Sequence, residues 1–166
     1  MTTRHLPGAA GPADPVRPGL EPLARFRVGL APAQEIGDTH HGTRRIVGVT
    51  GGTFDGPRLS GEVLPGGADW QLVHADGLAS IDTRYTLRTY DGVLVYLTTS
   101  GIRHAKPAIA ARLARGEPVR PDEYYFRMAC RFETGDPRYA WLTRGVVVGS
   151  GARVRDAVVY DAFTVT

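Results

Sequence analysis

Residues 51–70 read GGTFDGPRLSGEVLPGGADW, and this stretch decides the fold. It holds two Gly-Gly pairs and two further glycines around one short run of alternating polarity, at 58–64. A phosphate-binding loop places such glycines between a strand and the start of a helix, because the helix amides hold the anion. Here the glycines lead into another strand-like run, and no lysine follows them. They are therefore predicted to form turns, bulges and close backbone crossings of a β-sheet.

Short runs of alternating polarity continue along the chain, separated by glycines and Asp-Gly turns, which is typical of an antiparallel all-β protein. Strands are predicted at residues 23–30, 44–50, 58–64, 69–74, 79–90, 93–99, 124–133, 145–149 and 158–165. So many short strands avoid exposed edges by closing on themselves or by folding into a sandwich, and closure is expected here. The sequence therefore predicts a closed antiparallel β-barrel of about 8–10 strands, whose interior is filled by side chains or holds one small ligand.

One segment, KPAIAARLARGEP at 106–118, predicts a helix. Pro107 suits a first turn, Ile109 and Leu113 lie on one face, and Gly116 is a stop signal. A helix of two or three turns in such a protein is expected to cap or cover the barrel.

The length and composition of the chain limit how many domains it can form and indicate its cellular compartment. At 166 residues the chain is most simply one domain, predicted at 23–166, and the Pro/Gly-rich residues 1–22 are predicted to be a disordered tail. Neither a secretory leader nor a run of about 18 apolar residues occurs, which predicts a cytoplasmic protein without a membrane partner. The lone Cys130 fits a reducing compartment and a place in the core. The net charge of +3 is spread along the chain, which argues against a nucleic-acid partner.

Three blocks of sequence resemble a known family. They are RRIVGVTGGTFDGPRLSGEVLPGGADWQLV at 44–73, DTRYTLRTYDGVLVYLTTSGIRH at 82–104 and YYFRMACRFETGDPRYAWLTRGVVVGSG at 124–151. In this order they resemble the domain of unknown function 3237 family, also called the UPF0311 proteins. The resemblance implies a compact antiparallel β-barrel that is often oligomeric, so a homo-oligomer is expected. It implies no general activity, and the function must be sought in the residues.

Each long predicted strand has one apolar and one charged face, because side chains alternate along a strand. The charged faces of two such strands carry Asp82, Arg84 and Arg88, and Arg127, Arg131 and Glu133. Two orientations are open. The apolar faces fill the interior and the ions face water, or the ions line a wet cavity and pair there to offset their desolvation.

The second orientation predicts an active site. Asp82 and Glu133 are then the general acid and base, and Arg84 and Arg127 hold a substrate carboxylate or a developing enolate. Further substrate-binding residues are predicted from the same faces and from aromatic or rim positions: Glu62, Trp70, Tyr96, Arg131, Trp141 and His41.

The motifs that are absent narrow the chemistry. The sequence has no Rossmann or P-loop signature, no metal-binding spacing and no GxSxG elbow, which favours chemistry without a cofactor or metal. The predicted function is a cofactor-independent barrel enzyme that acts on a mid-sized, partly apolar metabolite by proton transfer, as an isomerase, cyclase or hydro-lyase. Two alternatives stay open: a non-catalytic small-molecule carrier with the same cavity, and a structural or oligomerising domain with a filled core.

Overall fold

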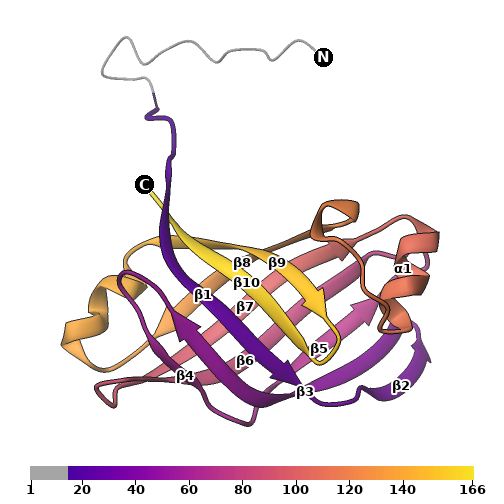
Figure 1. Ribbon diagram of the computed structural model, residues 1–166, viewed down its shortest axis with the longest axis horizontal. Helices are drawn as coiled ribbons and strands as arrows, with labels where there is room; N and C mark the ends of the chain where they lie inside the picture. Colours follow the sequence, from indigo (N-terminus) through magenta and orange to yellow (C-terminus); the bar gives the residue numbers. More distant parts are fainter. Residues whose placement is uncertain (1–14) are drawn as a thin grey trace.

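The computed structural model describes residues 15–166 of the chain (Figure 1). Strands dominate this part, with one α-helix and two short 3₁₀ helices. In chain order the elements are β1 (Leu20–Leu30), β2 (Gln34–Thr39), β3 (Gly42–Asp55), β4 (Gly61–Val63), β5 (Ala68–Val73), β6 (Ala79–Thr89), β7 (Leu94–His104), α1 (Pro107–Ala114), η1 (Pro121–Glu123), β8 (Tyr125–Glu133), η2 (Pro137–Thr143), β9 (Val146–Val154) and β10 (Ala157–Val165).

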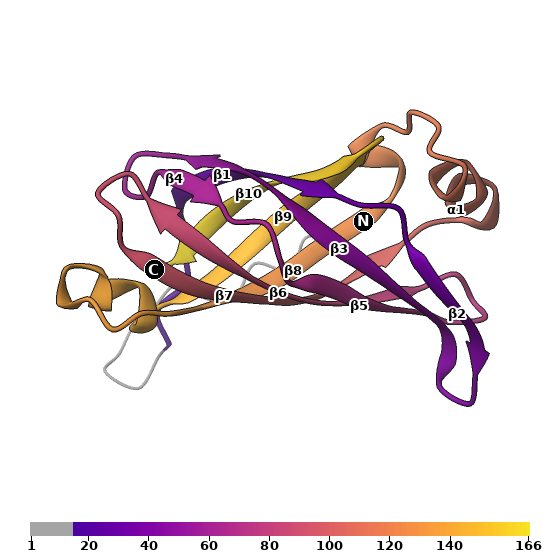
Figure 2. The ribbon, with the colours of Figure 1, turned by 90° about the horizontal axis from the view of Figure 1, so that it is seen from below.

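The strands close into an antiparallel barrel, as predicted. Hydrogen-bonded pairs run from β1 through β10, β9, β8 and β7 to β6, and β3 returns to pair with β1. Both β4 and β5 pair with β3 and with β6, so they fill one position of the ring in succession. The barrel thus has eight strand positions. The sequence did not predict β2, a short and mostly exposed strand that pairs with β3 in a hairpin extending from one end (Figure 2).

The glycines of 51–70 are the corners and crossings that the sequence predicted. Gly52, Gly66 and Gly67 adopt positive φ angles of 149°, 105° and 79°. A Cβ on Gly52 would lie 2.0 Å from the carbonyl oxygen of Arg27, and one on Gly67 would lie 2.0 Å from that of Arg84. Side chains at these two positions are excluded because neighbouring strands pass directly beside them.

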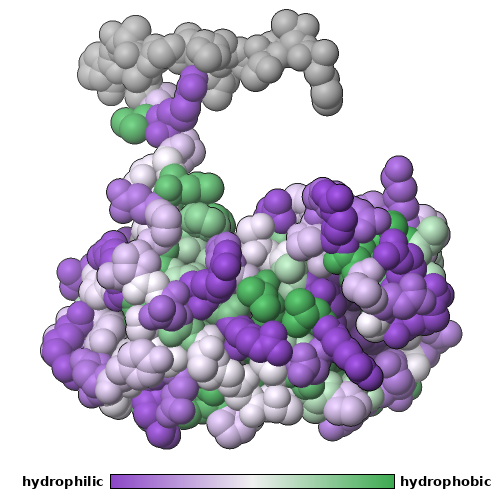
Figure 3. Space-filling model, viewed as in Figure 1, coloured by the Kyte–Doolittle hydropathy of each residue, from purple (hydrophilic) through white to green (hydrophobic). Residues whose placement is uncertain are grey.

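Apolar side chains fill the middle of the barrel. The Phe26 ring stacks on Phe54 at 5.2 Å and on Tyr160 at 4.6 Å between ring centroids. In β8 every second side chain, from Phe126 to Phe132, is buried. Figure 3 shows a largely hydrophilic outer face, on which hydrophobic side chains lie in small groups among the hydrophilic ones. The interior is therefore the apolar face of each strand, which is the first of the two orientations.

A hydrogen bond joins two buried tyrosines in this core. The hydroxyl oxygens of Tyr85 and Tyr160 lie 2.6 Å apart, and burial raises the pKa of both phenols. Because a lone buried hydroxyl loses its partner, Tyr85→Phe and Tyr160→Phe should each lower the free energy of unfolding by about 1–3 kcal/mol. The double variant should lose clearly less than the sum of the two, which urea denaturation of the four proteins measures. Additive losses would show that the two hydroxyls do not stabilise one another.

Helices lie at the two ends of the barrel. The predicted helix is present as α1, with Pro107 at its start and Gly116, at a φ of 71°, just beyond its end. It lies at the same end as the β2–β3 hairpin, and η2 lies at the other (Figures 1 and 2). Because β1 begins at Leu20, the last three residues of the predicted tail belong to the barrel, and residues 1–14 lie outside the described part. None of the helices in the described part is long and apolar enough to cross a membrane.

Candidate functional site

A cavity of about 600 Å³ opens at the α1 end of the barrel. Its apolar wall comes from strands, from α1 and from the β1–β2 loop, and it includes Leu30, Pro32, Val47, Val73 and Leu113. Five arginines and two carboxylates also line it: Arg45, Arg103, Arg115, Arg153, Arg155, Glu35 and Asp156. The volume is in the range of small-molecule sites, about 300–1,000 Å³.

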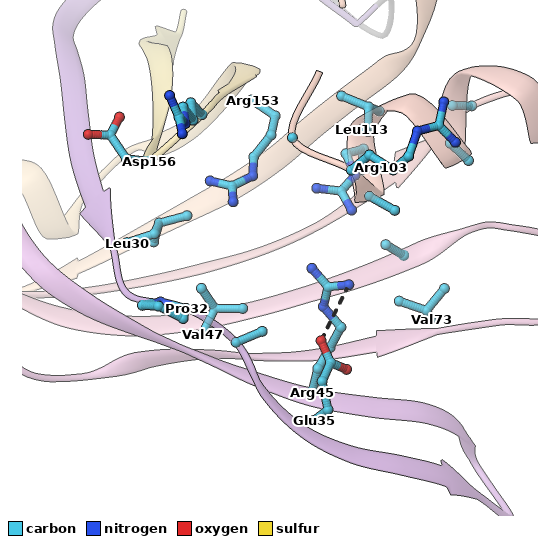
Figure 4. A pocket seen from close by; sticks show the side chains of 18 of the residues that line it. Leu30, Pro32, Glu35, Arg45, Val47, Val73, Arg103, Leu113, Arg153 and Asp156 are labelled. Carbon is cyan, nitrogen blue, oxygen red and sulfur yellow. Dashed lines mark ion pairs between the residues drawn. The ribbon is translucent and has the colours of Figure 1, made fainter. Parts of the chain in front are cut away.

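Three of these arginines converge from different strands. Arg45 lies on β3, Arg103 on β7 and Arg153 on β9, each at an inward-facing position of its strand. Figure 4 shows the three guanidinium groups pointing into the same cavity. Each continues a row of buried side chains toward the barrel end, as Val95, Leu97 and Thr99 precede Arg103 on β7. The strands thus change from apolar to cationic where the interior opens.

A carboxylate and an amide form the floor beneath the arginines. Asp69 and Gln71 are inward-facing residues of β5 and are 8% and 4% exposed. Oδ1 of Asp69 accepts from the backbone N–H of Asp82 at 3.1 Å, and Oδ2 accepts from Nε2 of Gln71 at 3.1 Å. Both side chains line a small void of about 20 Å³, together with Arg45, Arg103 and Arg153. This void shares Leu30, Val47 and the three arginines with the cavity, and the buried Ile81 and Phe126 also line it.

Burial shifts the pKa values of the charged groups at this end. The pKa of the Asp69 carboxyl is raised by desolvation, against the hydrogen bonds it accepts and the nearby Arg103. The pKa of Arg103 is lowered to about 10, first by desolvation and then by the like charges of Arg45 and Arg153. Desolvation and Arg45 also lower the pKa of Arg153. A carboxylate with a raised pKa beside crowded cations is the arrangement in which proton transfer and anion stabilisation are combined.

The sequence-predicted catalytic residues lie elsewhere. Asp82 and Arg84 form an ion pair of 3.0 Å, but their side chains are 51% and 48% exposed on the outer wall. Arg127 and Glu133 are likewise exposed, on the outward face of β8. The prediction that these four side chains line the interior is therefore wrong. Aliphatic and aromatic side chains fill that space without the cost of several kcal/mol per ion that burying charges incurs.

The predicted substrate-binding residues do not meet in one place either. Glu62 pairs with Arg88 at 3.0 Å on the outside, and Arg131 and Tyr96 are exposed. The guanidinium of Arg84 lies over the Trp70 ring, and that of Arg58 over the Trp141 ring.

His41 lies in the β2–β3 turn, and its ring centroid is 3.8 Å from that of His40. This position is outside the set of residues that line the cavity. Across residues 15–166 no three His, Cys, Asp or Glu side chains form a group that could hold a metal ion.

The residues at the barrel mouth were missed by sequence reasoning, although a signal for them exists. Arg45, Asp69, Gln71, Arg103 and Arg153 interrupt the apolar register of strands whose other inward residues are hydrophobic. A polar residue in the apolar register near a strand end is the signal that marks each of them separately, without showing that they meet. The charged registers of β6 and β8 were more conspicuous, and they face solvent.

A second hollow lies on the outer wall. It is an open groove of about 690 Å³ across β7, β8 and β9, and Ile102, Tyr125, Arg127, Val148 and Phe163 contribute to it. Tyr125 is 50% and Ile102 is 40% exposed. The groove is open and largely apolar, and it lacks the cluster of charges found at the barrel mouth.

Two fungal proteins are distant matches. A protein of Penicillium roqueforti named PR-toxin biosynthesis cluster protein 7 is 27% identical over 155 residues, which are 82% of this chain and 83% of that protein. A solved structure described as an enzyme from Penicillium herquei has 22% identity and a TM-score of 0.69, and the match covers 93% of this chain and 98% of that one. At this identity the second match shows the fold alone.

Bacterial matches are much closer. A β-barrel like protein from Acinetobacter baumannii has 49% identity and a TM-score of 0.82, over 93% of this chain and 99% of that one. A UPF0311 protein of Rhodopseudomonas palustris is 44% identical over 140 residues, which are 84% of this chain and 90% of that protein. The model of the family described as Protein of unknown function (DUF3237) matches residues 18–165. The chain therefore belongs to the DUF3237 family, as its sequence blocks indicated.

Proposed function

We propose that the chain is a cofactor-independent barrel enzyme that acts on a mid-sized, partly apolar metabolite by proton transfer, with Asp69 as the base. The observation that carries this proposal is the position of Asp69. It is a carboxylate 8% exposed, on the interior side of β5, in a void that it shares with three arginines. A base of raised pKa beside groups that stabilise an anion is what abstraction of a weakly acidic proton requires.

The reaction at this site balances within one substrate. An O–H or activated C–H bond breaks, the proton passes to the Asp69 carboxylate, and the electron pair stays on the substrate as a phenolate or enolate. The guanidinium groups of Arg103 and its neighbours stabilise that charge. Return of the proton at another atom is an isomerisation. Attack of the anion on an electrophilic carbon of the same molecule, with the proton returned to the product, is a cyclisation, and expulsion of hydroxide that takes up the proton is loss of water.

Two further points support a reaction on a metabolite. The apolar wall from Leu30, Val47 and Val73 suits a ring or chain held close to the base. The similarity to a protein of a toxin biosynthesis cluster favours an enzyme over a structural domain. The compartment and the homo-oligomer stay predictions.

The carrier alternative also has an observation in its favour. Both oxygens of the Asp69 carboxylate already accept hydrogen bonds from the protein, so Asp69 is also suited to hold β5 and Gln71 in place. A carrier would use the same cavity without moving a proton.

Isotope exchange separates the enzyme from the carrier. Native mass spectrometry of freshly purified protein identifies a retained small molecule and counts the subunits. That molecule, and related compounds, are then incubated with the protein in D₂O, and the ligand is recovered. The enzyme reading predicts conversion of the ligand or incorporation of deuterium at one position, whereas recovery of unchanged, unlabelled ligands would favour the carrier.

A further inference from the structure

We infer that the group recognised at the barrel mouth is an oxyanion on an otherwise apolar molecule, and that Arg45, Arg103 and Arg153 bind it. The inference concerns the site of the proposed function and names the class of its ligand. It rests on that proposal only for the step after binding.

The first support is an imbalance of charge inside the mouth. The small void beneath the cavity is lined by three arginines and one carboxylate, Asp69. Among residues 15–166, the Arg103 side chain has no ion-pair or hydrogen-bond partner, and the Arg153 side chain donates only to the carbonyl of Ala157, at 3.1 Å. The Arg45 guanidinium lies 4.0 Å from the carboxylate of Glu35, a side chain that is 59% exposed. Partly buried arginines without matched carboxylates are costly unless another anion compensates them.

The second support comes from buried polar atoms that have no partner. Nε of Arg45 and Oε1 of Gln71 are buried and form no hydrogen bond with any described residue. Gln71 is 4% exposed, and its Nε2 is committed to Asp69. Buried donors and acceptors in folded proteins are nearly always paired, so unpaired ones beside a cavity indicate atoms that a ligand satisfies. An N–H donor among guanidinium groups suits an oxygen of an anion.

The third support is the composition of the cavity above this cluster. Its wall is formed by Leu30, Val47, Val73 and Leu113, with small residues between them. Arg155 and Asp156 also line this mouth, and Arg115 there pairs with Glu117 at 2.6 Å. A cationic floor under an apolar wall fits a molecule with one anionic end and a hydrophobic body.

The oxyanion can be a carboxylate or a phosphate, and a matched set of probes separates them. The probes are 1-naphthoate, 1-naphthyl phosphate and the neutral 1-naphthamide, which share one ring system. Isothermal titration at pH 8 and low salt measures their affinities. At least one anion should bind at least about tenfold tighter than the amide, and the tighter anion names the group. Equal affinity for the amide and both anions would overturn the inference.

Substitutions locate the binding. Arg103→Gln and Arg153→Gln should each weaken the preferred anion by at least about fivefold and leave 1-naphthamide unchanged. Arg131→Gln, on the outer wall of β8, is the matched control and should change neither affinity. Circular dichroism and thermal unfolding check each variant. The melting temperatures should equal or exceed that of the wild type, because one of three crowded positive charges is removed. Undiminished anion binding in folded Arg103→Gln and Arg153→Gln would overturn the inference.

Asp69→Asn distinguishes a failure of this inference from a failure of the proposed enzyme. The variant should bind the anion at least as tightly as the wild type, because a nearby negative charge is lost. If it binds the anion and keeps its turnover, the proposed base is wrong and the anion site stands. If it loses turnover while the wild type shows no preference for either anion, the base stands and the anion site is wrong.

Discussion

Replacing Gly67 with alanine should abolish the folded protein. A Cβ at this position would lie 2.0 Å from the Arg84 carbonyl oxygen and 3.1 Å from the Tyr85 Cα, and both are backbone atoms of the adjacent strand β6. The φ of 79° adds strain that a non-glycine residue rarely tolerates. Since β6 cannot move away without breaking its pairing with β5, the loss should exceed about 4 kcal/mol, near the total stability of many small domains.

The neighbouring glycine provides the control. Gly66 has a φ of 105°, but a Cβ there meets nothing within 4 Å. Gly66→Ala should therefore cost only the backbone strain, about 1–3 kcal/mol, and leave a cooperative unfolding transition. Soluble yield, circular dichroism and urea denaturation compare the two variants. Similar losses in both would mean that close strand crossing is not the reason for Gly67.

Asp69→Asn should lower turnover of the substrate by about 10²–10⁴-fold while the protein stays folded and binds ligand. The amide can accept the hydrogen bond from the Asp82 backbone N–H, but it cannot accept the substrate proton. Asp82→Asn is the matched control on the outer face of the next strand, where the carboxylate is 51% exposed and pairs with Arg84. It should keep nearly full activity. Loss of turnover in Asp82→Asn and not in Asp69→Asn would restore the outer-face residues as the catalytic ones.

The pH dependence of the wild type has a defined sign. Only ionised Asp69 accepts a proton, so kcat/KM should rise with pH through the raised pKa of this carboxyl. It should fall again as Arg103, with its pKa lowered to about 10, loses its charge and no longer stabilises the anion. The rise in kcat/KM should therefore lie at a higher pH than it would if the base were a solvent-exposed carboxylate.

The contribution of Asp69 to the free energy of unfolding should fall with rising pH, whereas its contribution to kcat/KM should rise. Its pKa is higher in the folded than in the unfolded chain, so the folded state binds the proton more tightly. The resulting stabilisation is present at low pH and is lost as the pH rises through the folded pKa. Asp69→Asn should remove this component, which urea denaturation across the acidic range measures in both proteins.

The sequence was sufficient for the barrel because its signals are local. Alternation along 79–89 and 125–133 reports strands, and Asp-Gly turns and the glycines of 51–70 report where they end and cross. The same alternation could not say which face is inward, since Asp82 and Arg84 are as compatible with a wet cavity as with solvent. The answer depends on how many strands close the ring, because eight positions leave room mainly for apolar side chains.

The candidate site could not be predicted for a different reason. Arg45, Asp69, Arg103 and Arg153 come from four strands spread over more than one hundred residues, and only the closed register brings them to one end. Each of these residues is the polar exception in an otherwise apolar strand face. When the strands are considered one at a time, such an exception does not indicate a site. Their common position at the α1 end becomes apparent only once the pairing register of all strands in the closed barrel is known.

The central claim is that the ligand lies among the inward-facing charges at the α1 end, and a crystal structure of the protein with 1-naphthoate tests it most directly. The account predicts a carboxylate within hydrogen-bond distance of at least two of the guanidinium groups of Arg45, Arg103 and Arg153, with the ring against Leu30 and Val47. Density for the probe solely in the outer groove beside Tyr125 and Arg127 would contradict it.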